Sequence, residues 1–529
     1  MKRAPRLGVA RVGVASVDVA IVGGGVAGTL LARQLRARLP GLRITVFERG
    51  AGASFKVGES TVEIAAHYLV RRQGLGQYLY ENHLPKNGIR YFFDGPQRDL
   101  PLTEMSELGT INLPFHAAFQ LDRARLETDL IEMCRGEGID VRIGTRVTEI
   151  HLGDGDERHE LCIEGPAGSE RLRPRWVIDA AGRQGTLARQ LGLREPEREH
   201  QIGAVWGRFE GLADVDRMGD DAFRGRVRHT TRGLSTIHFH NPGYWVWLIR
   251  LRGGLTSVGV VGTPARDRAL RSPEGFRSFL DEHRALREIL ADAKAIDHGS
   301  MARIAYGTKR FLGHGRWALV GEAASASDPL YSPGLDFVAL ESDFITDVIA
   351  REAEGESSDA IAERIDLYDH FLAFRHEAVM RLYRGQYGMI GSYELMRLKW
   401  DFDIASYHNL WVAPFMTDQH LDPDWLRRQL RLRNLVLRAM ENFAGLFGRA
   451  EESLREQGNY YRRNRGVFSY GLENIDFLPQ IGLPRTQRQT LEQAQRTFNI
   501  VRRDALALLG QDAGEEDWPL QAFVTRPLA

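Results

Sequence analysis

The chain has 529 residues, of which 43% are hydrophobic and 26% charged, and its 70 basic and 70 acidic side chains give a formal net charge of zero. This is a globular composition with enough length for several domains, and the balanced charge predicts no nucleic-acid partner and no anionic membrane surface. The only two cysteines, Cys134 and Cys162, predict neither a disulfide framework nor a metal site, so we expect a cytoplasmic protein.

The first sixteen residues, MKRAPRLGVARVGVAS, are basic but lack a long apolar core. They lead directly into a strand-like run, so we expect neither a signal peptide nor a membrane span there. No later segment has the roughly 18 uninterrupted apolar residues that a spanning helix needs. The sequence therefore predicts no membrane partner.

Residues 17–48 contain an apolar strand (VAIV), a glycine turn, an apolar-periodic helix and a second strand (ITVF). Gly23, Gly25 and Gly28 form G-x-G-x-x-G between strand and helix, and Glu48 follows about twenty residues later. These glycines permit a tight turn, close approach of a pyrophosphate and close helix packing, while Glu48 can accept hydrogen bonds from ribose hydroxyls. The segment predicts a site for FAD or NAD, and the neighbouring cofactor contacts we expect are Ala27 and Arg49.

Three later segments favour FAD. They are FQLDRARLETDLIEMC, WVIDAAGRQG and RWALVGEAASASDPLYSPGLDFVALESD, and each resembles a signature of the flavin monooxygenase-like superfamily. The resemblance implies that Arg123 reaches the cofactor, although a solvated helix arginine is the alternative. It also implies that Glu322, where many members have aspartate, contacts the ribitol or ribose. The remaining cofactor residues implied by these segments are Asp179, Gly182, Pro329, Gly334 and Leu335.

Four short motifs in the same order narrow the resemblance further. FKVGEST, NHLPKNGIRYFF, YWVWLIRL and DPLYSPG resemble motifs of the flavin-dependent halogenases, and the similarity spans about residues 17–350. These two-component enzymes receive reduced FAD (FADH2) from a separate NAD(P)H-flavin reductase. With oxygen and a halide, chloride or bromide, they form hypohalous acid and halogenate electron-rich carbons. The first motif adds the expected cofactor contacts Gly58, Glu59 and Ser60.

The resemblance assigns the chemistry to three side chains. Lys86 falls at the position of the lysine that holds the oxidant or forms a haloamine, and an apolar wall would lower its pKa. Trp245 and Trp247 point to one face of a strand and would keep substrate away from the reacting flavin. The competing interpretations are a solvated surface lysine and two tryptophans that pack as ordinary core aromatics.

Three positions depart from the halogenase pattern. Arg250 replaces the proline that ends the tryptophan motif, and Pro333, which has no N–H, replaces a hydroxyl residue often found beside the halide. Tyr331, an expected substrate contact, stands where the tryptophan-acting branch has a glutamate. We therefore expect a phenol or pyrrole as substrate, free or bound to a carrier protein, in secondary metabolism such as antibiotic biosynthesis.

The predicted fold class is α/β: a Rossmann-type FAD-binding domain (1–195 and 301–350), an inserted antiparallel β-sheet facing the substrate (196–300) and a C-terminal helical region (351–529). His238 and His240 share a strand face, but without a third ligand we predict no metal site. Aromatic residues at helical spacing predict pocket residues in the helical region. These are Tyr393, Trp400, Tyr407 and Trp411.

The leading hypothesis is therefore an FAD-dependent halogenase of an electron-rich aromatic. A flavin-dependent monooxygenase or oxidase of the same fold would instead give a product that does not depend on halide. A third possibility is a flavin-binding protein without redox turnover, such as a redox-neutral cyclase, which would consume no oxygen.

Overall fold

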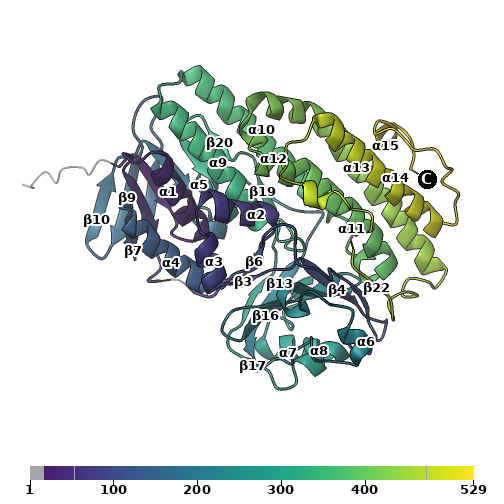
Figure 1. Cartoon of the computed structure of the whole chain (residues 1–529). Coiled ribbons are helices and arrows are strands. Elements are labelled where there is room, and N and C mark those ends of the chain that lie inside the picture. Colours follow the sequence, from purple (N-terminus) through teal and green to yellow (C-terminus); the bar gives the residue numbers. More distant parts are fainter. Residues whose placement is uncertain (1–16, 53, 472, 529) are drawn as a thin grey trace, which may run out of the picture.

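The computed structural model describes residues 17–52, 54–471 and 473–528, so the basic leader lies outside the described residues. Its first body is a six-stranded sheet in the order β20-β21-β11-β1-β2-β7, parallel except for the β20–β21 pair (Figure 1). In chain order the strands are β1 Val19–Val22, β2 Ile44–Glu48, β7 Asp140–Ile143, β11 Trp176–Asp179, β20 Leu312–Gly313 and β21 Trp317–Leu319.

The sheet has the doubly wound form that its sequence predicts. Strand β1 is buried along its whole length, as expected of a central parallel strand covered on both faces. Helix α1 (Val26–Arg38) packs against α4 (Arg123–Gly136) and α9 (Gly334–Ala353). Strands β20 and β21, which follow residue 300 in the chain, complete the sheet at one edge.

The second body is a nine-stranded sheet in the order β17-β13-β16-β15-β14-β4-β5-β22, with β18 also on β13. Strands from outside the range 196–300 enter it: β4 (Ile89–Phe93), β5 (Ser106–Leu108) and β22 (Phe468–Ser469). The β14–β4 and β22–β5 pairs are parallel, so the sheet is not purely antiparallel. The strands inside the predicted range are β13 Gly203–Glu210, β14 Thr236–Asn241, β15 Tyr244–Arg250, β16 Leu255–Gly262, β17 Lys294–Ala295 and β18 Gly299–Met301.

The two faces of this sheet belong to different cores, because neighbouring strand residues point to opposite sides. Trp245 and Trp247 join the core shared with the FAD-binding domain and the C-terminal helices. Val246 and Leu248 face the other way, into a separate core with α7 (Pro273–Asp281) and α8 (Arg284–Ile289). The sheet thus separates the larger core of the molecule from the smaller core that it forms with α7 and α8.

The C-terminal region is helical, and it lies beside both sheets (Figure 1). Its main helices are α10 Ser358–Arg381, α11 Tyr393–Tyr407, α13 Pro423–Glu456 and α14 Gln487–Leu508. A five-residue π-helical turn, His408–Val412, follows α11 directly. Within the described ranges, no helix is long and apolar enough to cross a membrane. No group of three or more His, Cys, Asp or Glu side chains among the same residues could hold a metal ion.

Candidate active site

The turn between β1 and α1 can be built only with glycine. Gly23 has a φ of 117°, and a Cβ there would lie 2.2 Å from the Ala180 carbonyl oxygen. A Cβ at Gly28 would lie 2.0 Å from the Gly23 carbonyl oxygen. Gly25 has more room, because its nearest neighbours are the Glu127 carboxylate and the Lys56 ammonium, about 4 Å away. The open space at Gly25, in front of the unpaired N–H groups of α1, fits a pyrophosphate.

Glu48 fixes the same turn from the end of β2. Its carboxylate accepts hydrogen bonds from the Gly24 N–H at 2.9 Å and the Gly50 N–H at 2.7 Å. Arg49 is exposed, and its guanidinium donates to Gln184. The carboxylate therefore lies beside the loop where the G-x-G-x-x-G pattern predicts a ribose.

Two other expected cofactor residues are engaged with protein groups. Arg123 donates to the carbonyls of Val57 at 3.0 Å and Gly58 at 3.3 Å, and it pairs with Glu127. Because Gly58 has a φ of 90°, and a Cβ there would lie 2.6 Å from the Arg123 guanidinium, this contact needs the glycine. Arg123 is thus not a solvated helix arginine, and it anchors the loop of residues 56–60.

Asp179 is also held by protein groups. Its buried carboxylate accepts hydrogen bonds from the backbone N–H groups of Ala181, Leu187 and Ala188, and burial raises its pKa. It shapes the turn after β11. Gly182 follows with a φ of 61°.

The segment before α9 forms a compact turn with one strained residue. Ser332 has a φ of 57°, and Pro333 leads into the helix that begins at Gly334. A Cβ at Gly334 would meet no atom within 4 Å, so this helix start faces open space, while Leu335 is buried. Pro329 is half-buried in the turn, and Glu322 is 52% exposed, with one oxygen 3.6 Å from Arg183.

A buried network ties this turn to the first tryptophan. Asp328 accepts hydrogen bonds at 2.6 Å from His200 and from the Tyr387 hydroxyl, which in turn accepts the indole N–H of Trp245 at 2.9 Å. Trp247 donates to the Ser257 hydroxyl at 3.1 Å. The two indole centroids lie 5.9 Å apart. Both indoles are therefore fixed by hydrogen bonds as well as by packing.

Lys86 is buried, with 1% of its surface exposed. Its ammonium donates to the Ser60 hydroxyl at 2.8 Å and to the Thr61 carbonyl at 2.9 Å. Burial lowers the pKa of Lys86 to about 8, even though the nearby Glu63 and Asp336 favour the charged form. This buried position excludes a solvated surface lysine. Glu59, which belongs to the FKVGEST motif, is paired with buried Arg208 at 2.9 Å.

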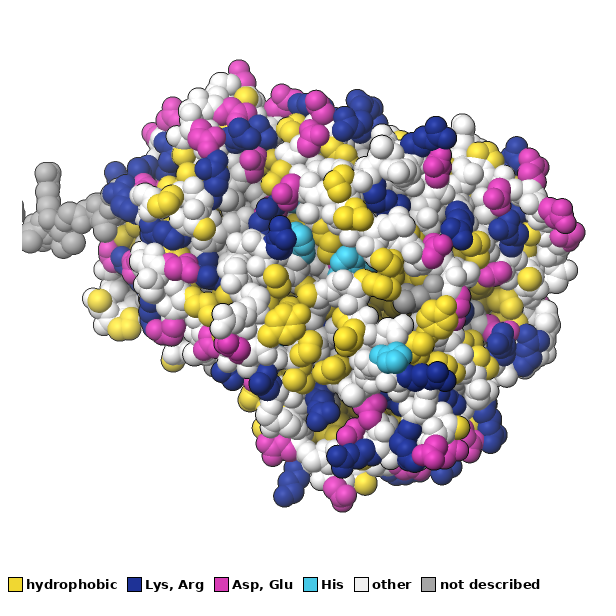
Figure 2. Space-filling model, viewed as in Figure 1, with side chains coloured by type: hydrophobic (Ala, Val, Ile, Leu, Met, Phe, Trp, Pro, Cys, Tyr) yellow, Lys and Arg dark blue, Asp and Glu magenta, His cyan; other side chains and the backbone are white. Residues whose placement is uncertain are grey.

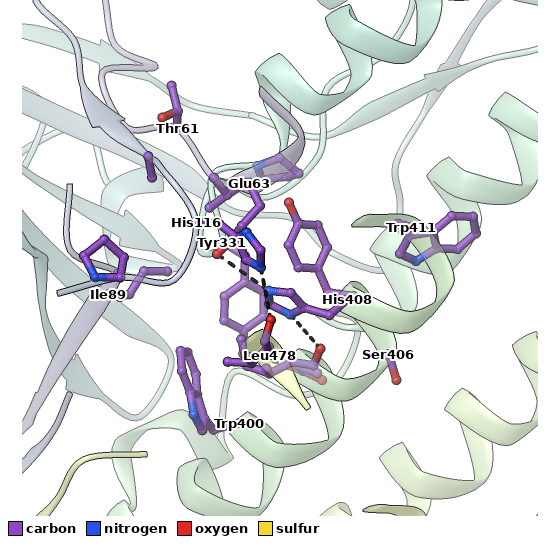
Figure 3. A pocket seen from close by; sticks show the side chains of 18 of the residues that line it. Thr61, Glu63, Ile89, His116, Tyr331, Trp400, Ser406, His408, Trp411 and Leu478 are labelled. Carbon is purple, nitrogen blue, oxygen red and sulfur yellow. Dashed lines mark hydrogen bonds and ion pairs between the residues drawn. The ribbon is translucent and has the colours of Figure 1, made fainter. Parts of the chain in front are cut away.

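Lys86 lines a cavity to which β4 and the C-terminal helices α10 and α11 contribute. Figure 3 shows part of the wall of this cavity. Its walls are rich in aromatic rings, which are Tyr331, Tyr383, Trp400, Tyr407, Trp411 and Tyr470. Neither indole of the tryptophan motif lines it. The prediction that Tyr393 is a pocket residue is wrong. Its ring packs against Phe93, with ring centroids 5.4 Å apart, and it does not line the cavity. Helical spacing shows that a residue is buried but does not tell which neighbour covers it.

Two ion pairs in the cavity wall were not foreseen from the sequence. Glu63, the first residue of α2 (Glu63–His67), lies 3.6 Å from His408 of the π-helical turn. Buried Arg375 lies 3.8 Å from Asp336, and burial raises the pKa of Asp336 to about 7. The one local signal for Glu63 is its place three residues after Ser60 of the GES motif, where it opens a helix. Nothing near His408 in the sequence marks it as its partner.

The three residues that depart from the halogenase motifs lie in different surroundings. The Tyr331 hydroxyl donates to Asp403 at 2.6 Å, and Lys399 pairs with the same carboxylate at 2.8 Å. Pro333 lines the cavity. Arg250, at the end of β15, is exposed and lies over Gly233, away from both indole rings. The substitution by arginine therefore does not alter the cavity wall.

Comparisons with known proteins agree with this geometry. A family model described as FAD binding domain matches residues 16–337, more than half of the chain. Flavin-dependent halogenase chlA of Dictyostelium discoideum is 26% identical over 426 residues, covering 74% of this chain and 69% of that protein. Tetracycline 7-halogenase of Kitasatospora aureofaciens is 28% identical over 324 residues, covering 56% of this chain and 57% of that protein. A 1H-pyrrole-2-carbonyl-(peptidyl-carrier protein) chlorinase of Pseudomonas fluorescens is 28% identical, covering 61% and 71%.

Solved structures share the fold over most of the chain. The crystal structure of halogenase PltM has a TM-score of 0.63 at 18% identity and covers 93% of this chain and 97% of that one. The flavin-dependent halogenase CmlS has a TM-score of 0.56 at 22% identity, covering 81% and 73%. The chain therefore belongs to the FAD-binding-domain family, and its curated relatives are flavin-dependent halogenases. It is a flavin-dependent oxidoreductase whose cofactor is FAD.

Proposed function

We propose that this protein is a flavin-dependent halogenase that acts on a phenol-type aromatic in secondary metabolism. The observation that carries the proposal is Lys86, a buried amine of lowered pKa in the wall of an aromatic cavity. When bound, reduced FAD would supply the oxygen chemistry that turns a halide, chloride or bromide, into hypohalous acid. A separate NAD(P)H-flavin reductase would deliver the reduced cofactor.

Lys86 suits the transfer of such an oxidant. An amine with a pKa of about 8 is partly neutral near physiological pH, so it can attack hypohalous acid, and its charged form can hold the acid by hydrogen bonding. Ser60 and Thr61 fix the direction of the Nζ atom, since both accept its hydrogen bonds. The aromatic walls exclude water, which would otherwise consume the oxidant.

The shape of the cavity supports an aromatic substrate that enters from outside. Figure 2 shows hydrophobic side chains gathered on the face where the two sheets and the helices meet. Leu113 and Phe115 line the cavity and are 66% and 55% exposed, which places them at its mouth. Halogenase PltM, whose fold this chain shares, binds phloroglucinol in a crystal structure with FAD. A carrier-bound substrate remains the second form to test, since one relative acts on a carrier-bound pyrrole.

The test is reconstitution of the purified protein with FAD, a flavin reductase, NADH and chloride or bromide, with phenols, pyrroles and indoles as substrates. Mass spectra should show a halogenated phenol, and Lys86→Met should abolish it without loss of bound FAD. Lys294→Met, which changes an exposed lysine in β17, is the matched control. An oxygenated product that forms equally without halide would contradict halogenation and support the monooxygenase alternative, for which Pro333 is the observation in favour.

A further inference from the structure

Glu63 and His408 face the cavity, and neither has a place in handling the oxidant or in holding FAD. Figure 3 shows them facing each other, with the rings of Tyr331, Trp400 and Trp411 around them. We propose that Glu63, held in place by His408, accepts the hydroxyl proton of a phenolic substrate as the carbon–halogen bond forms. This inference rests on the function proposed above.

The proposal rests on the position of Glu63 relative to Lys86. The two side chains line the same cavity and influence each other's ionisation. Nevertheless, Lys86 has no carboxylate within 4.0 Å among the described residues, and its two hydrogen bonds go to Ser60 and Thr61. A carboxylate and an amine therefore face the same space without neutralising each other. A substrate ring between them would meet a halogen donor on one side and a proton acceptor on the other.

His408 is oriented for its part by its other nitrogen. Its Nδ1 lies 3.0 Å from the Ile404 carbonyl, which can only accept, so Nδ1 carries a hydrogen and Nε2 is turned to Glu63. His408 opens the π-helical turn that interrupts the helical run after α11, and such turns are frequent at functional sites. No other cation of the described chain lies within 4.0 Å of the Glu63 carboxylate. One carboxylate oxygen is thus paired with His408, while the side chain keeps 26% of its surface open to the cavity.

The step balances without a further reagent. The substrate carbon attacks the halogen of hypohalous acid, or of the haloamine that Lys86 forms with release of water, so that a carbon–halogen bond forms. The oxygen–halogen or nitrogen–halogen bond breaks, and its electron pair stays on the hydroxide or the amine. The phenol proton passes to Glu63 as positive charge develops on the ring. The ring proton then leaves with the hydroxide as water, or on the amine. Glu63 returns its proton to the phenolate oxygen and is again a carboxylate, so the net reaction of phenol with hypohalous acid gives halophenol and water.

A weakly basic carboxylate is sufficient for this transfer. Although burial alone would raise its pKa, the neighbouring His408 lowers the pKa of Glu63 to about 2, so it stays ionised near neutral pH. A phenol in its ground state does not give up its proton to such a base. Once the ring carries the positive charge of the halogenated intermediate, its hydroxyl becomes strongly acidic and the transfer is downhill. Glu63 thus accepts the proton during formation of the carbon–halogen bond, which is the step that has the barrier.

The experiment compares wild type, Glu63→Gln and the exposed control Glu132→Gln on resorcinol and on a more acidic fluorinated resorcinol, from pH 6 to 10. General-base catalysis supplies roughly 10²–10⁴-fold, so Glu63→Gln should lower kcat about 100-fold at pH 7. The ratio of variant to wild type should recover as each phenol ionises in solution, and at a lower pH for the fluorinated one. His408→Gln, which removes only the positioning contact, should lose about tenfold in kcat.

Bound FAD and thermal unfolding of each variant separate a folding defect from a loss of proton transfer. A loss in Glu63→Gln that is the same at every pH and for both phenols would overturn the inference, as would wild-type rates at pH 7. In either case halogenation by the wild type would leave the proposed function standing. If the wild type forms no halogenated product from any substrate offered, the proposed function and this inference both fail.

Discussion

The glycine turn and the aromatic cavity represent two ways of making a functional site. The turn lies within six residues, Gly23 to Gly28, and its requirements concern the backbone alone. The cavity draws on segments from Thr61 to Leu478, and its requirements concern buried ionisable side chains. The turn therefore adds little chemistry but leaves no room for a side chain at Gly23 or Gly28, whereas the cavity gains chemistry from groups whose burial opposes folding.

The largest effect should come from the turn. Gly23→Val would place a β-branched side chain at a φ of 117° and its Cβ 2.2 Å from a carbonyl oxygen. We expect a loss of at least about 4 kcal/mol in the free energy of unfolding and no retained FAD. Urea unfolding and flavin absorbance measure the two effects. Gly41→Ala is the control, since nothing lies within 4 Å of that position, and equal effects of both changes would contradict a local backbone requirement.

Lys86→Met should instead increase the free energy of unfolding. Its pKa falls from 10.5 to about 8 on folding, so the unfolded chain binds more protons between those values and wild-type stability rises with pH there. Below pH 8 the burial penalty of the charged amine is fully present, about 3 kcal/mol at 1.36 kcal/mol per unit. After about 1 kcal/mol for the lost hydrogen bonds, the variant should gain about 2 kcal/mol at pH 7.

Urea unfolding at pH 7 and at pH 10 checks this sign. The gain of Lys86→Met over wild type should shrink as the pH rises, because the wild-type amine becomes neutral. A variant less stable than wild type at pH 7 would show that the hydrogen bonds to Ser60 and Thr61 outweigh the cost of burying the charge.

The smallest effect should come from Tyr331→Phe. It removes one donor from the buried Asp403 carboxylate, which Lys399 continues to hold. We expect a loss of about 1–2 kcal/mol in the free energy of unfolding and unchanged FAD affinity. A fall in FAD affinity would mean that the cavity and the cofactor turn are coupled through the segment before α9, and fluorescence titration with FAD would detect it.

Local patterns were predictable from the sequence, and long-range pairings were not. The G-x-G-x-x-G turn and the return of the chain to the first sheet follow from strand and helix periodicity over short windows. The placement of β4, β5 and β22 in the nine-stranded sheet depends on partners more than a hundred residues away, such as β14 for β4. For the same reason the sequence around Glu63 gave no sign of His408 as its partner.

The order in which the cavity is completed has a consequence during synthesis. Lys86 and Glu63 leave the ribosome early, but His408, Tyr470 and Leu478, which close the space around them, are made more than three hundred residues later. A nascent chain can thus form its dinucleotide turn well before the amine is enclosed. Translation itself delays the competence to handle a diffusible oxidant until the C-terminal helical region has emerged.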